Sequence, residues 1–159
     1  MDLRRLRHGE WIAGVSGVVL LVSLFLDWYS AGGGAVAANA WESFAVTDVL
    51  LAITALFGLA VAIGAATQRS PAVPQATGGL TVPIAFAAAI VVLIRALALP
   101  GGADGREIGL YLGIAGVLGV LVGAWRSIGD ESFPKGASPQ VEVTPLPAPK
   151  PRNEPAGDR

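Results

Sequence analysis

The chain contains no cysteine, one histidine and only two lysines among its 159 residues. The absence of cysteine excludes a disulfide framework and a thiolate metal site. The single histidine, His8, has no cluster of metal-ligating residues around it in the sequence, so we expect no metal and no cofactor. The eleven basic residues are scattered rather than banded, which is untypical of a nucleic-acid-binding surface.

Charge is also scarce, since charged residues make up 14% of the chain, against about 25% in soluble domains. Hydrophobic residues make up 53%, and the mean hydropathy is +0.60. A helix needs roughly 20 mainly apolar residues to cross a bilayer. Four stretches qualify, at about residues 11–28, 47–66, 80–99 and 107–125. The sequence therefore predicts an all-α, polytopic membrane protein built as an antiparallel four-helix transmembrane bundle.

The chain divides into three regions by composition. Residues 1–10 form a basic N-terminus, and residues 11–128 form the four-helix transmembrane domain. Residues 129–159 hold seven of the eleven prolines, so we expect a disordered proline-rich cytoplasmic tail. Pro83 falls in the first turn of the third predicted span, where proline is tolerated.

The basic residues predict the orientation, because lysine and arginine are retained on the cytoplasmic side. Nine of the eleven lie before span 1, between spans 2 and 3, or after span 4, and only Arg95 and Arg106 lie on the other side. We therefore expect a multi-pass protein of the plasma membrane with both termini in the cytoplasm.

The aromatic residues predict the same two membrane levels, because tryptophan and tyrosine favour the interfaces. Trp11 and Trp125 mark the inner level, and Trp28, Tyr29 and Trp41 mark the outer one.

A cleaved signal peptide is the alternative for span 1. The chain offers a basic start, an apolar run and an A-x-A site at residues 38–40. The apolar run is longer than is typical of a signal peptide, and a polar, glycine-rich segment separates it from the site. We therefore expect span 1 to be retained.

Arg95 lies inside the apolar run IVVLIRALALP, near the outer end of span 3. A charge in the membrane usually faces a partner or the bundle interior. We expect Arg95 to form an ion pair with Asp48 or Asp27 and so to hold the outer ends of three helices together. The alternative is that its side chain extends to the lipid headgroups.

Glycines predict how the helices pack, because small residues permit close backbone approach within lipid. Span 1 contains IAGVSGV and span 4 contains IAGVLGV, with Gly17 and Gly119 at matching depths, so an antiparallel contact between these spans is expected. The glycines could instead serve homodimerisation. The candidate packing residues are Gly14, Gly17, Gly109, Gly113, Gly116, Gly119 and Gly123.

The sequence FLDWY ends span 1, AWESF follows it, and Asp48 lies before the apolar run of span 2. With these residues the chain resembles small four-span membrane proteins encoded in actinobacteria, and the resemblance covers residues 1–128. Asp27 departs from the pattern, where an apolar residue or proline is expected. The resemblance implies four helices in the plasma membrane and no activity.

No catalytic constellation is present, so we expect a non-enzymatic structural, accessory or interaction protein, partnered by lipid and by its own copies or another membrane protein. The membrane hydroxyls, such as Ser23 and Thr54, have no histidine or lysine beside them, and we expect them to hydrogen-bond between helices. The alternative is a small oligomeric transporter or channel, although no span has an ionisable residue at its centre.

Overall fold

The computed structural model describes residues 6–43, 46–67 and 72–130, with the side chains of 72–75 and 130 excepted. Most of these residues are helical. The elements are α1 (His8–Ser23), β1 (Asp27–Ala31), β2 (Val36–Asn39), α2 (Ala40–Ser43), α3 (Thr47–Thr67), α4 (Ala72–Leu97), β3 (Gly105–Arg106) and α5 (Ile108–Asp130). The predicted proline-rich tail lies outside the described residues except for its first two, which belong to α5.

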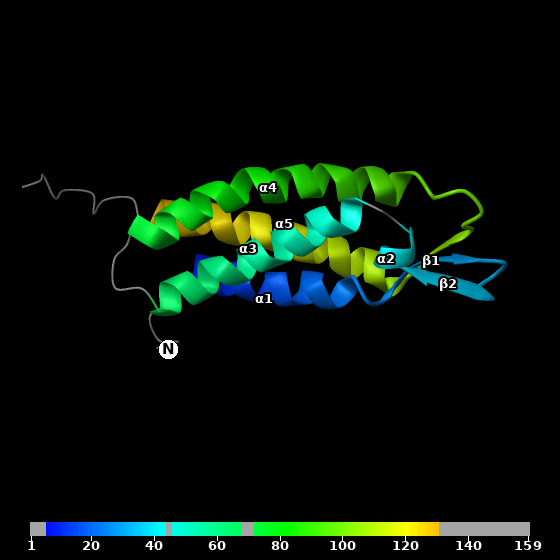
Figure 1. Ribbon diagram of the computed structural model, residues 1–159, viewed down its shortest axis with the longest axis horizontal. Helices are drawn as coiled ribbons and strands as arrows, with labels where there is room; N and C mark the ends of the chain where they lie inside the picture. The colour runs from blue at the N-terminus through cyan, green and yellow to red at the C-terminus, as the bar shows by residue number, and fades with distance from the viewer. Residues whose placement is uncertain (1–5, 44–45, 68–71, 131–159) are drawn as a thin grey trace, which may run out of the picture.

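The four long helices lie side by side in an elongated bundle (Figure 1). The strands and α2 gather at one end, called here the sheet end. The first residues of α1 and the last residues of α5 meet at the other, called here the terminal end (Figure 1). A Cβ atom built on Gly9 would lie 2.7 Å from the backbone nitrogen of Ser127, which shows how closely the two helices approach there.

Three of the four predicted spans have the length and composition to cross a membrane. They are residues Thr47–Thr67 of α3, Ala76–Leu97 of α4 and Ile108–Gly129 of α5. The fourth, α1, is apolar but has only 16 residues. At about 1.5 Å per residue it is roughly 24 Å long, against about 30 Å for the hydrocarbon core of a bilayer.

The helix boundaries differ from the predicted ones in α1, α4 and α5, and α5 continues to Asp130 rather than ending at about residue 125. The α1 helix ends at Ser23, so Trp28 belongs to a strand rather than to span 1. The α4 helix begins at Ala72, earlier than the predicted start of the third span at about residue 80, and Pro83 is therefore inside it rather than in its first turn. Proline has no N–H to donate to the carbonyl of Gly79. A glycine with open space around it occupies that position.

The expectation of an all-α chain is wrong at the sheet end, where a three-stranded antiparallel sheet forms in the order β2-β1-β3. Gly32, Gly33 and Gly34 connect β1 to β2 with φ of 64°, 68° and 92°. Glycine adopts such angles at no steric cost. A tight reversal after a segment containing Trp28 and Tyr29 is a hairpin signal that the helical reading of this region missed.

The expected antiparallel contact between the first and last long helices is present. Along α5, Gly116 faces Leu20, Gly119 faces Ser16 and Gly123 faces Ala13, so residue numbers fall on α1 as they rise on α5. A Cβ on Gly116 would lie 2.8 Å from that of Leu20. These glycines let the backbones of α1 and α5 approach each other within one chain. Because α1 covers them, they are not exposed for contact with a second copy of the chain.

Two of the three glycines of α1, Gly14 and Gly17, face a different neighbour from the expected one. Gly17 lies against the backbone of Ala55 and Leu59 in α3, and Gly14 lies against Ala62 of the same helix. The α1 helix thus has α5 on one side and α3 on another. Gly119 faces Ser16, which precedes Gly17 in the chain, so Gly17 and Gly119 lie at about the same level along the bundle. The two glycines nevertheless contact different helices.

Candidate functional site at the sheet end

The strand β1 joins the bundle to the sheet and is paired on both sides. Tyr29 is in register with Ala38 of β2 and with Arg106 of β3. Two backbone bonds extend the β3 edge, since the N–H of Asp104 donates to the carbonyl of Ser30 at 3.0 Å and that of Glu107 to the carbonyl of Trp28 at 2.9 Å. The segment between α4 and α5 is therefore fastened to the strand that follows α1.

Trp28 fills the space between α1 and α5 and is fully buried. Its indole Nε1–H donates to the carbonyl of Ser23 at 2.7 Å, and the same carbonyl also accepts from the backbone N–H of Leu26 at 3.2 Å. The ring lies across Gly109 and Gly113, and a Cβ on either glycine would be 2.6 Å from a ring carbon. This GxxxG pair therefore accommodates an indole.

Two side chains from the sheet bind the end of α4. The hydroxyl of Tyr29 donates to the backbone carbonyl of Arg95 at 2.8 Å, and Nε of Arg106 donates to that of Ala96 at 2.7 Å. Both carbonyls belong to the last turn of α4, where no further helical N–H follows. The positive charge of Arg106 also suits the negative end of the helix dipole. Burial raises the pKa of Tyr29 above its ordinary value, although nearby Arg95 and Arg106 oppose the shift.

The first turn of α3 contributes a buried carboxylate to the same region. Asp48 is only 2% exposed, and its Oδ1 has no hydrogen-bond partner among the described residues. Arg95 acts electrostatically on this carboxylate. A buried oxygen without a hydrogen-bond partner is costly, and the attraction of Arg95 offsets part of that cost. Asp27, the other predicted partner, lies exposed in β1 opposite Asn39.

A cleft opens between the hairpin, α2 and the turn after α4, with a volume of about 390 Å³. Its polar lining includes Tyr29, Glu42 and Ser43. Glu42 accepts a hydrogen bond from the N–H of Asn39, and the Ser43 hydroxyl donates to the carbonyl of Asn39. These groups hold α2 on the end of β2, beside the cleft. Within the described ranges no three His, Cys, Asp or Glu residues lie together as metal ligands.

The predicted interface aromatics fall into two groups. Trp11 and Trp125 are exposed at the terminal end, and Trp41 is exposed at the sheet end, where its ring lies 6.2 Å from that of Phe25. Trp28 and Tyr29 are instead buried within the protein. Trp28 and Tyr29 follow an apolar run, where interfacial aromatic residues are also found. Their burial results from the strand conformation of β1.

The membrane hydroxyls bond within their own helices rather than between helices. Ser23 donates to the carbonyl of Leu20 and Thr54 to that of Leu50, each at 2.7 Å. Residues three or four positions apart lie on one face of a helix, so each hydroxyl finds a nearby carbonyl. The expectation of interhelical bonds is therefore wrong for these two residues.

The chain matches no protein-family model, no curated protein and no solved structure.

Proposed function

We propose that this chain is an integral protein of the plasma membrane that crosses the bilayer four times and serves a structural, accessory or interaction role. The carrying observation is that the outward faces of the long helices are apolar. Exposed side chains on these faces include Val18, Leu56, Ile90, Leu93, Leu118 and Val122. In water such an apolar surface would be prone to association, whereas the hydrocarbon of a bilayer solvates it.

The short helix α1 is the fourth span in this proposal. It packs against both α5 and α3, each long enough to cross, so it shares their depth. Apolar residues 24–26 continue it towards the sheet end, where Phe25 and Trp41 form the aromatic pair expected at headgroup level. The A-x-A site at residues 38–40 lies in β2 and at buried Ala40, which favours a retained span 1.

The basic residues orient this bundle with both termini in the cytoplasm and the sheet end outside. The chain is then a candidate member of the four-span actinobacterial proteins that it resembles. The hairpin, α2 and the cleft beside them form a polar surface on the outer side in this proposal, and they are the surface proposed to contact a partner protein.

The absence of native cysteine permits a direct topology test. Single cysteines replace Ala35 in the hairpin and Ser138 in the tail, and intact cells are treated with a membrane-impermeant maleimide. The proposal expects labelling of Ala35→Cys in intact cells and of Ser138→Cys only after permeabilisation. Labelling of both in intact cells, or release of the protein into buffer without detergent, contradicts it.

The partner role is tested by photocrosslinking in intact cells. A photoreactive residue at Trp41, exposed at the sheet end, is expected to give a discrete protein adduct. The control is the same residue at Val18, exposed on α1, which faces lipid in this proposal. Equal adducts at both positions, or none at Trp41, would remove the support for an interaction surface at the sheet end.

The buried carboxylate of Asp48 favours a second candidate, a small oligomeric transporter or channel. Ion and proton pathways use ionisable groups inside the bundle, and Asp48 is such a group at the outer end of α3. Asp27 is exposed, so Asp48 is the residue to test. Proton-coupled flux in proteoliposomes that Asp48→Asn abolishes and Asp27→Asn retains would rank this candidate first.

A further inference from the structure

The cleft at the sheet end, with a volume of about 390 Å³, lies against one face of the hairpin. Tyr29 of β1 is in register with Ala38 of β2, and Ala31 with Val36. All four residues line the cleft. Side chains two positions apart in a strand point to the same face, so these four residues form one wall. The turn at residues 100–103 and the helix α2 complete the lining.

The lining of the cleft combines apolar walls with one charge. Alanine, valine and the buried Tyr29 make up the hairpin wall, and Glu42 is the one charged side chain among the described residues that line the cleft. Lysine and arginine side chains show the same division, since each has an apolar stem that packs on hydrocarbon and a charged head. The lining therefore matches a basic side chain.

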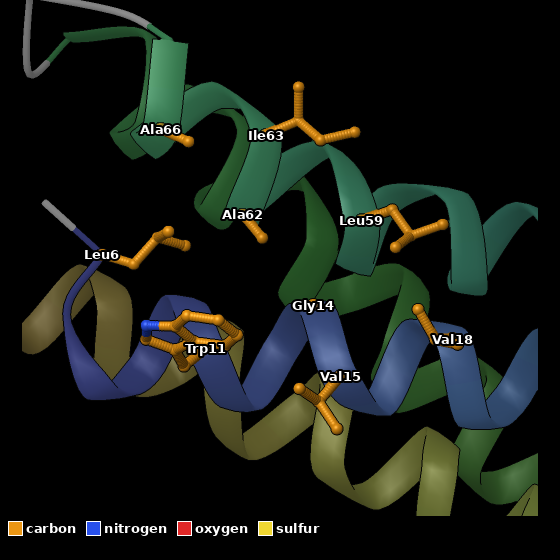
Figure 2. Close-up of a pocket in the computed structure, with 9 residues that line it drawn as sticks. All are labelled: Leu6, Trp11, Gly14, Val15, Val18, Leu59, Ala62, Ile63 and Ala66. Atoms are coloured by element: carbon orange, nitrogen blue, oxygen red, sulfur yellow. The ribbon is translucent and has the colours of Figure 1, made fainter. Parts of the chain in front are cut away.

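The groove between α1 and α3 at the terminal end has no such charge (Figure 2). Its volume is about 210 Å³, and the described residues that line it are apolar apart from the indole nitrogen of Trp11. In a membrane, lipid tails are as apolar as such a lining and fill it without selection. Of these two hollows, the cleft is therefore the one whose lining distinguishes one ligand from another.

The carboxylate of Glu42 is held in place by one of its two oxygens. Its Oε2 accepts from the N–H of Asn39, and the N–H of Glu42 donates to Oδ1 of Asn39, each at 3.1 Å. This reciprocal pair is a capping box, which fixes the side chain at the start of α2. No hydrogen bond from the described residues reaches Oε1, so this oxygen is free to accept one from a ligand.

The surface around the cleft is negatively charged. Asp27, Glu42 and Asp104 are exposed there, whereas Arg106 is the one exposed basic residue in the described part of the sheet end. The guanidinium of Arg106 is already bound to the end of α4, where its Nε donates to the carbonyl of Ala96. Opposite charges on two partners favour their encounter and their correct orientation. The sheet end is therefore complementary to a basic partner.

We propose that the cleft at the sheet end receives one lysine or arginine side chain of a partner protein. The hydrocarbon stem lies along Val36 and Ala38, and the cationic head pairs with Oε1 of Glu42. This inference rests on the interaction role proposed above, and it adds the chemistry of the partner that the sheet end recognises.

The test is photocrosslinking of the full chain in intact cells of its native host. A small diazirine-bearing aliphatic residue replaces Val36, which lines the cleft and is 65% exposed. A discrete protein adduct is expected, and Glu42→Gln in the same chain is expected to lower its yield about fivefold. Glutamine removes the charge but still accepts from the N–H of Asn39, so the capping box survives. Asp104→Asn, an exposed carboxylate outside the cleft, is the control and is expected to leave the yield unchanged.

Matched variants on β2 test the shape of the cleft. Ala38 lines the cleft, and its neighbour Ala37 points to the other face of the strand. Ala38→Phe is expected to fill the cleft and remove the adduct, whereas Ala37→Phe keeps it. Thermal unfolding in detergent checks that both variants fold.

Mass spectrometry of the adduct identifies the captured segment, which is expected to contain lysine or arginine beside the crosslinked residue. Glu42→Lys is expected to abolish the adduct, and replacing that basic residue of the partner by glutamate is expected to restore it. Rescue by this exchange of charges requires direct pairing and does not follow from a change in the fold of α2.

An adduct at Val36 that Glu42→Gln leaves unchanged would overturn this inference, as would a captured segment without a basic residue. Capture of a second copy of the chain would assign the cleft to self-association instead. If Trp41 gives an adduct and Val36 gives none, the interaction role stands and only the basic side chain in the cleft is wrong. If neither position gives an adduct, both proposals fail.

Discussion

The indole ring of Trp28 lies directly over Gly113 of α5, where a Cβ atom would be 2.6 Å from Cζ2 and 2.7 Å from Cη2. The strand after α1 thus inserts its side chain into the small-residue surface of the last helix. Close approach of this kind explains why Gly109 and Gly113 both lack a side chain.

Gly113→Ala is expected to destabilise the bundle by about 1–3 kcal/mol, because the added methyl group overlaps a buried ring. The measurement is thermal or denaturant unfolding in detergent. The control is Gly64→Ala in α3, where nothing lies within 4 Å of the added atom. Alanine is the better helix former, so the control is expected to be neutral or stabilising by up to about 1 kcal/mol. Equal stability of the two variants would contradict the packing of Trp28 on α5.

Trp28→Phe removes the donor that binds the carbonyl of Ser23 while keeping an aromatic ring in the core. The loss of this buried hydrogen bond is expected to cost about 0.5–1.5 kcal/mol, because the carbonyl of Ser23 keeps the N–H of Leu26. Trp41→Phe, on the exposed ring beside Phe25, serves as the control and is expected to cost less than about 0.5 kcal/mol. If both variants unfold alike in the same detergent, the indole nitrogen has no role in ending α1.

A double-mutant cycle tests the interaction between Arg95 and Asp48. Each of Asp48→Ala and Arg95→Ala is expected to destabilise the protein, because each leaves the other charge without its counterpart. The double variant is expected to be more stable than the sum of the two losses predicts, by at least about 0.5 kcal/mol. The same cycle with Asp27→Ala is expected to be additive, since Asp27 is exposed in β1. Simple additivity for Asp48 would favour the alternative in which Arg95 reaches the lipid headgroups.

Alkaline pH is expected to weaken the attachment of the sheet to α4. Burial raises the pKa of Tyr29 above 10.0, so the folded state holds the phenolic proton more tightly than the unfolded state. The stability from this group is therefore fully present below pH 10 and is lost as pH rises through the raised value. Ionisation also removes the hydroxyl hydrogen that binds the Arg95 carbonyl.

The chain has two tyrosines, which makes this effect separable by ultraviolet titration. In Tyr111→Phe the single remaining phenol is expected to titrate above pH 10, and the alkaline loss of stability persists. In Tyr29→Phe that part of the loss disappears. Titration of the remaining phenol of Tyr111→Phe at or below pH 10 would contradict the burial of Tyr29.

The sequence was sufficient to predict the helices, since each long apolar run of α3, α4 and α5 can satisfy its backbone only as a helix in lipid. It also predicted the contact of α1 with α5, because glycine at 116, 119 and 123 permits a close approach. The sequence-based prediction was wrong where one residue type suits two different environments. Trp28 and Tyr29 suit an interface as well as a strand, and composition cannot separate the two.

The tertiary structure decided which surface each of these residues meets. The strand β1 pairs with β3 in the connection between α4 and α5, and this pairing accompanies the placement of Tyr29 beside the end of α4 and of Trp28 against α5. Whether Gly17 faces α3 or α5 likewise depends on how α1 is rotated between these two neighbouring helices. Local composition fixes which segments are helical because backbone hydrogen bonds are local, whereas burial of a given side chain depends on contacts between segments far apart in the chain.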